Sequence, residues 1–180
     1  YYESSLANIG YRWTTINVID QGIPDSTYMR KNGMVIWNLG PKGKRYVVEE
    51  PIIASAIVNL QGYLRMGGKL LLVGQDYLYF NYPNPFADSV LSIISVTDDV
   101  GCDTIIGIIG DPISNNLNYP LEFTHLNGNG YGQDYVDDFA ASAIPVFLTN
   151  RTGNPTMLRK EVGNYRLLFS AFPIEAIPIV

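Results

Sequence analysis

The chain has 180 residues, of which 47% are hydrophobic and 16% charged, and its net charge is −5. This composition excludes a disordered chain, and the acidic balance excludes a basic domain that binds nucleic acid or an anionic membrane. The single cysteine cannot form an internal disulfide, and no apolar run approaches the length of a membrane span. A chain of this length predicts one domain over residues 1–180.

The two ends of the sequence predict an internal piece of a longer protein. Residues 1–9 have the spacing of the last turns of an amphipathic helix that ends at Gly10. A helix without its first turns suggests that an upstream strand is missing as well. Residues 172–180 stay apolar to the last position. An apolar tail of this kind is expected to continue into, or pack on, further structure.

Short apolar runs bounded by glycine and proline predict the strands. Several runs are nearly unbroken, which is typical of strands that are covered on both faces in a parallel sheet. The predicted strands are residues 14–19, 34–39, 69–73, 104–109, 143–148 and 166–171. Pro145 predicts an edge or irregular position for the fifth of these strands.

Helical spacing is clearest between Glu49 and Leu64, where apolar residues recur at i, i+3 and i+4 and Pro51 falls in the first turn. Residues 86–94 predict a short helix, and residues 112–133 predict a long loop rich in Asn, Gly and Tyr. The order of strands and helices predicts a three-layer α/β domain with a mainly parallel sheet.

Several segments together resemble one known family. They are YYESSL (1–6), IGY (9–11), VIDQGIPD (18–25), MVIWNLG (34–40), LQGYLRMGGKLLLVGQD (60–76), GDPI (110–113), DDFAASAIPVF (137–147) and YRLLFSAFPIEAI (165–177). They are similar to class I glutamine amidotransferase-like domains, in the degenerate version found in secreted bacterial and archaeal surface proteins. The resemblance spans nearly the whole chain and implies a flavodoxin-like fold whose first strand is missing here.

The same resemblance implies that the amidotransferase chemistry is absent. In active members of the family the elbow after the corresponding strand carries a cysteine, with a histidine and a glutamate downstream. Here the elbow reads Gly74-Gln75-Asp76. Cys102 lies in a different segment, and His125 and Glu175 have no nucleophile to activate.

Asp76 nevertheless stands at the carboxyl edge of a predicted parallel sheet, where such folds place ligands and nucleophiles. One hypothesis is a hydrolase or transferase that uses Asp76 with Glu175 or another carboxylate. The favoured interpretation is that Asp76 caps the next segment while Gln75 satisfies loop backbone. Cys102 is interpreted as structural, because neighbouring carboxylates should raise the pKa of its thiol.

The segment that follows residue 124 partly matches a calcium loop. Asn127, Asn129, Gly132 and Asp138 fall at positions 1, 3, 6 and 12 of the template, with Asp134 and Asp137 as further carboxylates. The charge of this ligand set is too low, so an Asn/Gly turn cluster is predicted instead. His125 has no spaced partners, and no metal or cofactor is predicted.

Tyr77, Tyr79 and Tyr82 follow the strand at 69–73. Exposed tyrosines at this edge would stack on a sugar or contact a protein, whereas the favoured interpretation folds their rings over the core. Asn150 begins an N-glycosylation sequon, Asn150-Arg151-Thr152.

The predicted function is a non-catalytic structural or interaction module of an extracellular or cell-surface protein, with neighbouring domains or other chains as partners. In its sharper form, a strand from a neighbouring chain fills the vacant first position of the sheet in a fibre or larger assembly. The alternatives are a carbohydrate-binding module and the hydrolase or transferase that uses Asp76. No catalytic, cofactor-binding or metal residue is assigned.

Overall fold

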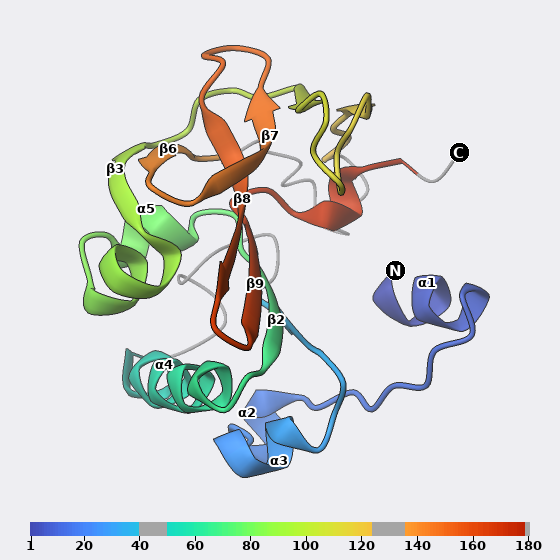
Figure 1. The fold of residues 1–180 in the computed structure, drawn as a ribbon, viewed down its shortest axis with the longest axis vertical. Coiled ribbons are helices and arrows are strands. Elements are labelled where there is room, and N and C mark those ends of the chain that lie inside the picture. Colours follow the sequence, from blue (N-terminus) through green and yellow to red (C-terminus); the bar gives the residue numbers. More distant parts are fainter. Residues whose placement is uncertain (40–49, 124–135, 179–180) are drawn as a thin grey trace.

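The computed structural model describes residues 1–39, 50–123 and 136–178. Seven strands form one mixed, curled sheet in the order β1-β2-β9-β8-β7-β4-β5, and β3 and β6 form a small second sheet (Figure 1). The strands are β1 (Val35–Asn38), β2 (Lys69–Val73), β3 (Ile93–Thr97), β4 (Thr104–Gly107), β5 (Asn118–Pro120), β6 (Asp138–Ala141), β7 (Ile144–Thr149), β8 (Pro155–Val162) and β9 (Tyr165–Ser170). The helices are α1 (Tyr2–Asn8), α2 (Val18–Gln21), α3 (Ser26–Arg30), α4 (Glu50–Arg65), α5 (Tyr77–Asn81), the π-helix η2 (Phe86–Leu91) and the 3-10 helix η3 (Ile174–Ala176).

The prediction of a three-layer, flavodoxin-like fold with a mainly parallel sheet is wrong. Only β1, β2 and β9 are parallel to one another, and the pairings from β9 through β8, β7 and β4 to β5 are all antiparallel. The apolar runs indicated burial on both faces, but they do not distinguish parallel neighbours from antiparallel ones, since both kinds of strand are covered here.

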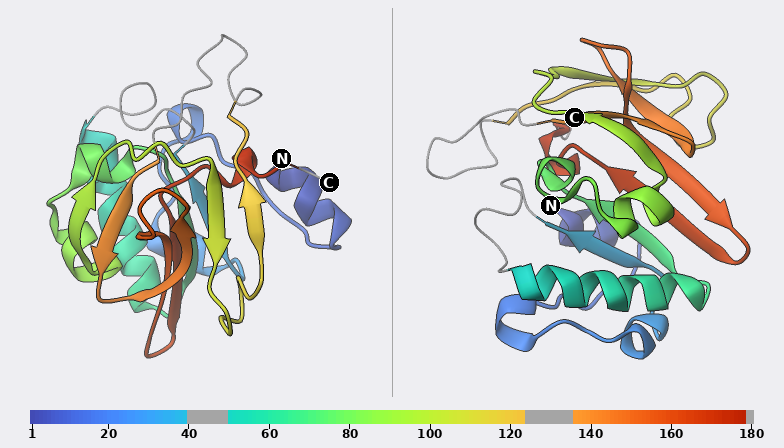
Figure 2. Two further views of the ribbon diagram at one scale, coloured as in Figure 1. Left: turned by 90° about the horizontal axis from the view of Figure 1, so that it is seen from above. Right: turned by 90° about the vertical axis from the view of Figure 1, so that its left-hand side faces the viewer.

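The two faces of the sheet bury different cores. Successive residues of a strand point to opposite faces, so Leu70 and Leu72 enter one core while Leu71 packs against the other. The first core is covered by α4 and by the small β3–β6 sheet, and α4 itself lies between the large sheet and the α2–α3 segment (Figure 2). The second core is closed by strands and irregular segments that include Phe123 and Phe172, where a three-layer fold would have helices.

The predicted strand at residues 14–19 is absent, which is a second correction. Residues 11–17 have no regular structure, and α2 begins at Val18. The side chain of Asn17 accepts a hydrogen bond from the Ile19 backbone nitrogen and so caps α2. This local bond competes with extended backbone, and β-branched residues do not form a strand without a neighbour to pair with.

Four other predicted strands are confirmed as β1, β2, β7 and β9, and a fifth is confirmed in shorter form as β4. The long helix is confirmed as α4, which docks on α3 through the Ser26 hydroxyl, a donor to the Asn59 carbonyl at 2.7 Å. Pro145 lies in an internal strand, but it coincides with a shift of register between β7 and β8, so the irregular position is confirmed and the edge position is not.

β8 was not predicted, although the sequence contains a signal for it. β8 and β9 pair as a hairpin from Val162 opposite Tyr165, so Gly163 and Asn164 form a two-residue loop. Gly163 has a φ of 57°, the left-handed conformation that such hairpin loops require. No helix in the described part of the chain is both long and apolar enough to cross a membrane.

Candidate carboxylate site

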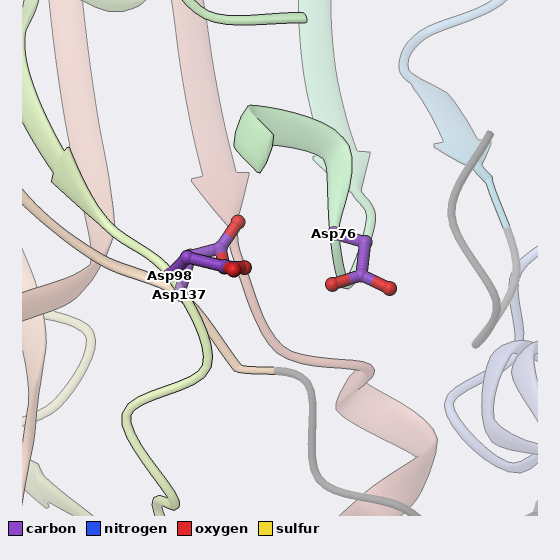
Figure 3. Close-up of side chains that lie close together, drawn as sticks. All are labelled: Asp76, Asp98 and Asp137. Carbon is purple, nitrogen blue, oxygen red and sulfur yellow. The ribbon is translucent and has the colours of Figure 1, made fainter. Parts of the chain in front are cut away.

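Three carboxylates that are far apart in the sequence converge beside the carboxyl end of β2. They belong to Asp76, Asp98 and Asp137, and one oxygen from each lies within 4.8 Å of the others (Figure 3). Asp76 follows β2, Asp98 directly follows β3, and Asp137 directly precedes β6. We call these residues the carboxylate triad.

Asp76 is positioned by the turn that leaves β2. Its φ is 58°, which is the left-handed conformation, and α5 begins at the next residue. The expected cap is not formed, because the Asp76 side chain makes no capping hydrogen bond to α5. Instead its carboxyl group lies near those of Asp98 and Asp137. Burial, followed by the charges of Asp98 and Asp99, raises the pKa of Asp76 to about 6.

Asp98 and Asp137 are brought together by the small sheet. Thr97 pairs with Asp138 in the antiparallel β3–β6 ladder, so Asp98 and Asp137 come next at the same end and share one face. Asp98 is exposed, whereas Asp137 is fully buried. This arrangement makes the triad open to solvent on one side and enclosed on the other.

The buried carboxylate of Asp137 also joins two chain segments. It accepts a hydrogen bond from the Tyr79 backbone nitrogen at 3.2 Å and a longer one from the Asp99 backbone nitrogen at 3.5 Å. Burial raises its pKa to about 7; the two hydrogen bonds oppose that rise, and the charges of Asp76 and Asp98 add to it. Burial and repulsion therefore outweigh the hydrogen bonds at this position.

Within the described ranges, no ion pair compensates the triad. The three ion pairs found there join Arg151 to Asp103, Arg159 to Asp111 and Arg166 to Glu161. A buried carboxylate that faces two others is costly unless a proton or a cation neutralises it. The triad must therefore hold protons, bind a cation, or exchange one for the other as conditions change.

The chemistry of the triad favours a hard divalent cation. Carboxylate oxygens are the ligands that Ca²⁺, Mg²⁺ and Mn²⁺ prefer, and three carboxylates leave room for water to complete the shell on the side of Asp98. The triad is less suited to general acid–base catalysis. A catalytic carboxyl group must reach the substrate, and Asp137 is fully buried.

The raised pKa values predict how stability depends on pH. A carboxyl group whose pKa is higher in the folded chain binds more protons when folded, so its contribution to stability is complete near pH 4 and is lost as the pH rises to about 7. In EDTA, the free energy of unfolding is expected to fall by about 5 kcal/mol over this interval, roughly 2 from Asp76 and roughly 3 from Asp137. Urea unfolding at pH 4.5 and 7.5 measures the change, and Asp137→Asn should flatten it. An equal slope in Asp137→Asn would assign the effect to other groups.

Glu175 is not part of the triad. Its carboxylate accepts hydrogen bonds from the Tyr2 hydroxyl and from the side-chain amide of Asn38, so it joins α1 to the end of β1. The hydrolase hypothesis paired Asp76 with Glu175 or another carboxylate, and the groups that the structure brings to Asp76 are Asp98 and Asp137.

Cys102 is fully buried in the second core, and its thiol donates to the Thr104 carbonyl at 3.3 Å, in agreement with a structural role. Gln75 is also buried.

His125, the Asn127–Gly132 segment and Asp134 lie outside the described residues. Of the carboxylates in the partial match to a calcium loop, Asp137 and Asp138 are described. Asp138 is buried on the other face of β6, where it accepts hydrogen bonds from Thr152 and Asn154.

The three tyrosines do not form a shared platform for a sugar. Tyr77 is buried against Phe169, and the Tyr82 hydroxyl donates to the Ile94 carbonyl. Tyr79 alone of the three presents a mostly exposed ring, with 55% of the residue accessible.

Asn150, the first residue of the sequon, is exposed after β7, and its side-chain amide contacts Asp103 and Thr104.

Asp98 is the member of the triad that sequence reasoning missed as a ligand. The sequence pattern predicts neither β3 nor β6, so it does not place Asp98 beside Asp137. The available signal was three separate acidic positions, at residues 76, 98–99 and 137–138, each beside an apolar run. That signal becomes specific only when the pairing of β3 with β6 is known.

No protein-family model matches the sequence, and no curated protein matches it. The resemblance to the amidotransferase-like group therefore stays a prediction.

Proposed function

We propose that this chain is a non-catalytic module of an extracellular or cell-surface protein and that the carboxylate triad binds a structural divalent cation. The observation that carries the proposal is the approach of three carboxylates to within 4.8 Å, one of them fully buried, with no ion pair in the described part of the chain to compensate them. A cation there would tie the end of β2 to the β3–β6 sheet.

Calcium is the cation that fits the proposed setting. Extracellular modules bind Ca²⁺ with dissociation constants of about 10⁻⁴ to 10⁻³ M, and an irregular set of three carboxylates suits the flexible shell of Ca²⁺ better than the near-ideal octahedron that Mg²⁺ demands. A site with only three carboxylates and an open side toward Asp98 is consistent with this weak class.

Calorimetric titration with calcium chloride at pH 8 tests the proposal, because Asp76 and Asp137 are both ionised there. One site is expected, and Asp98→Asn should weaken it at least about tenfold, since Asp98 supplies one of the three charges. Glu122→Gln is the matched control: it removes the same charge from another exposed position outside the triad. The absence of binding by Ca²⁺, Mg²⁺ and Mn²⁺ would overturn the proposal.

We also propose that the module receives a strand from a neighbouring chain of the same assembly along the outer side of β1. In the described ranges β1 has only β2 as a neighbour. The opposite edge of the sheet is protected, because β5 has three residues and ends in Pro120, whereas β1 carries Val35, Ile36 and Trp37 without a charge or a proline.

The register identifies the residue that tests this edge. The Leu39 backbone nitrogen donates to the Val73 carbonyl at 2.9 Å, so by alternation the backbone groups of Ile36 point away from β2. Ile36→Pro should therefore remove an outward donor without breaking the β1–β2 ladder. Trp37→Pro is the contrasting variant, since it removes a donor that points toward β2.

Light scattering of the native particle measures the outcome. The wild type is expected to exceed the mass of one 20.0 kDa chain as concentration rises, whereas Ile36→Pro should stay a single chain. At a dilution where both are single chains, the two should melt at the same temperature. A wild type that stays at 20.0 kDa at every concentration would contradict strand docking between chains and would leave the cation proposal untouched.

A further inference from the structure

We draw no further inference here: the strongest candidate, the row of exposed apolar side chains that Ile9, Tyr11, Trp13 and Ile19 present in the N-terminal segment, carries none because nothing in the structure shows what covers it.

Discussion

Asp98→Asn is expected to raise the melting temperature of the chain in calcium-free buffer at pH 8 and to reduce the rise that calcium produces in the wild type. The first effect follows from repulsion among the three carboxylates, because Asp98 faces two ionised groups at this pH. Like charges about 5 Å apart in a water-like medium repel by ~1 kcal/mol. For a chain of this size, the melting temperature should therefore rise by about 2 to 4 °C.

The second effect follows from linkage between binding and folding. A ligand that binds only the folded chain at 10 to 100 times its dissociation constant stabilises it by about 1.4 to 2.7 kcal/mol. Calcium at 10 mM should therefore raise the melting temperature of the wild type by about 3 to 10 °C. The advantage of Asp98→Asn over the wild type in EDTA should then be lost in calcium.

Thermal unfolding followed by circular dichroism measures both effects in the same samples. Glu122→Gln serves as the control and should respond to calcium as the wild type does. A nonspecific effect of ionic strength is excluded by repeating the series in sodium chloride of equal ionic strength. If calcium stabilises Asp98→Asn as much as the wild type, the triad is not the binding site.

Phe169→Ala is expected to cause the largest loss of stability among single substitutions in the first core. Phe169 is fully buried in β9, and its ring centroid lies 5.8 Å from that of Tyr77 and 5.8 Å from that of Phe139. Replacing a buried phenylalanine with alanine leaves a cavity and costs about 3 to 5 kcal/mol. Urea unfolding measures the loss. The control is Val58→Ala on α4, where the residue is 65% exposed, and it should change the free energy of unfolding by less than about 0.5 kcal/mol.

Phe169 also connects the core to the carboxylate triad. Tyr77 directly follows Asp76, and Phe139 lies two residues after Asp137, so one ring holds the segments that carry two of the three carboxylates. Phe169→Leu preserves most of the volume, so it should fold with a loss of less than about 1.5 kcal/mol. Its calcium affinity should nevertheless fall more than that of Val58→Ala. Unchanged affinity in Phe169→Leu would show that the triad is positioned independently of this ring.

The local elements that were predicted correctly are those whose signal is contained within a few residues. α4 has apolar positions at helical spacing and Pro51 in its first turn, and β2 is a compact apolar run between Gly68 and Gly74. β3 and β6 were missed because their exposed faces interrupt the apolar pattern. The strand expected at residues 14–19 failed because pairing, which residues in the same segment cannot supply, decides whether β-branched residues form a strand.

The sequence by itself determined a folded, acidic, largely apolar chain, the position of its main helix and central strands, and the break after Val73 at Gly74-Gln75-Asp76. Only the tertiary structure decided the mixed sheet and the carboxylate triad. Strand direction depends on which neighbours each strand meets, and the approach of Asp76 to Asp98 and Asp137 depends on a ladder between segments about 40 residues apart. Both are contacts between distant parts of the chain, which periodicity within one segment does not contain.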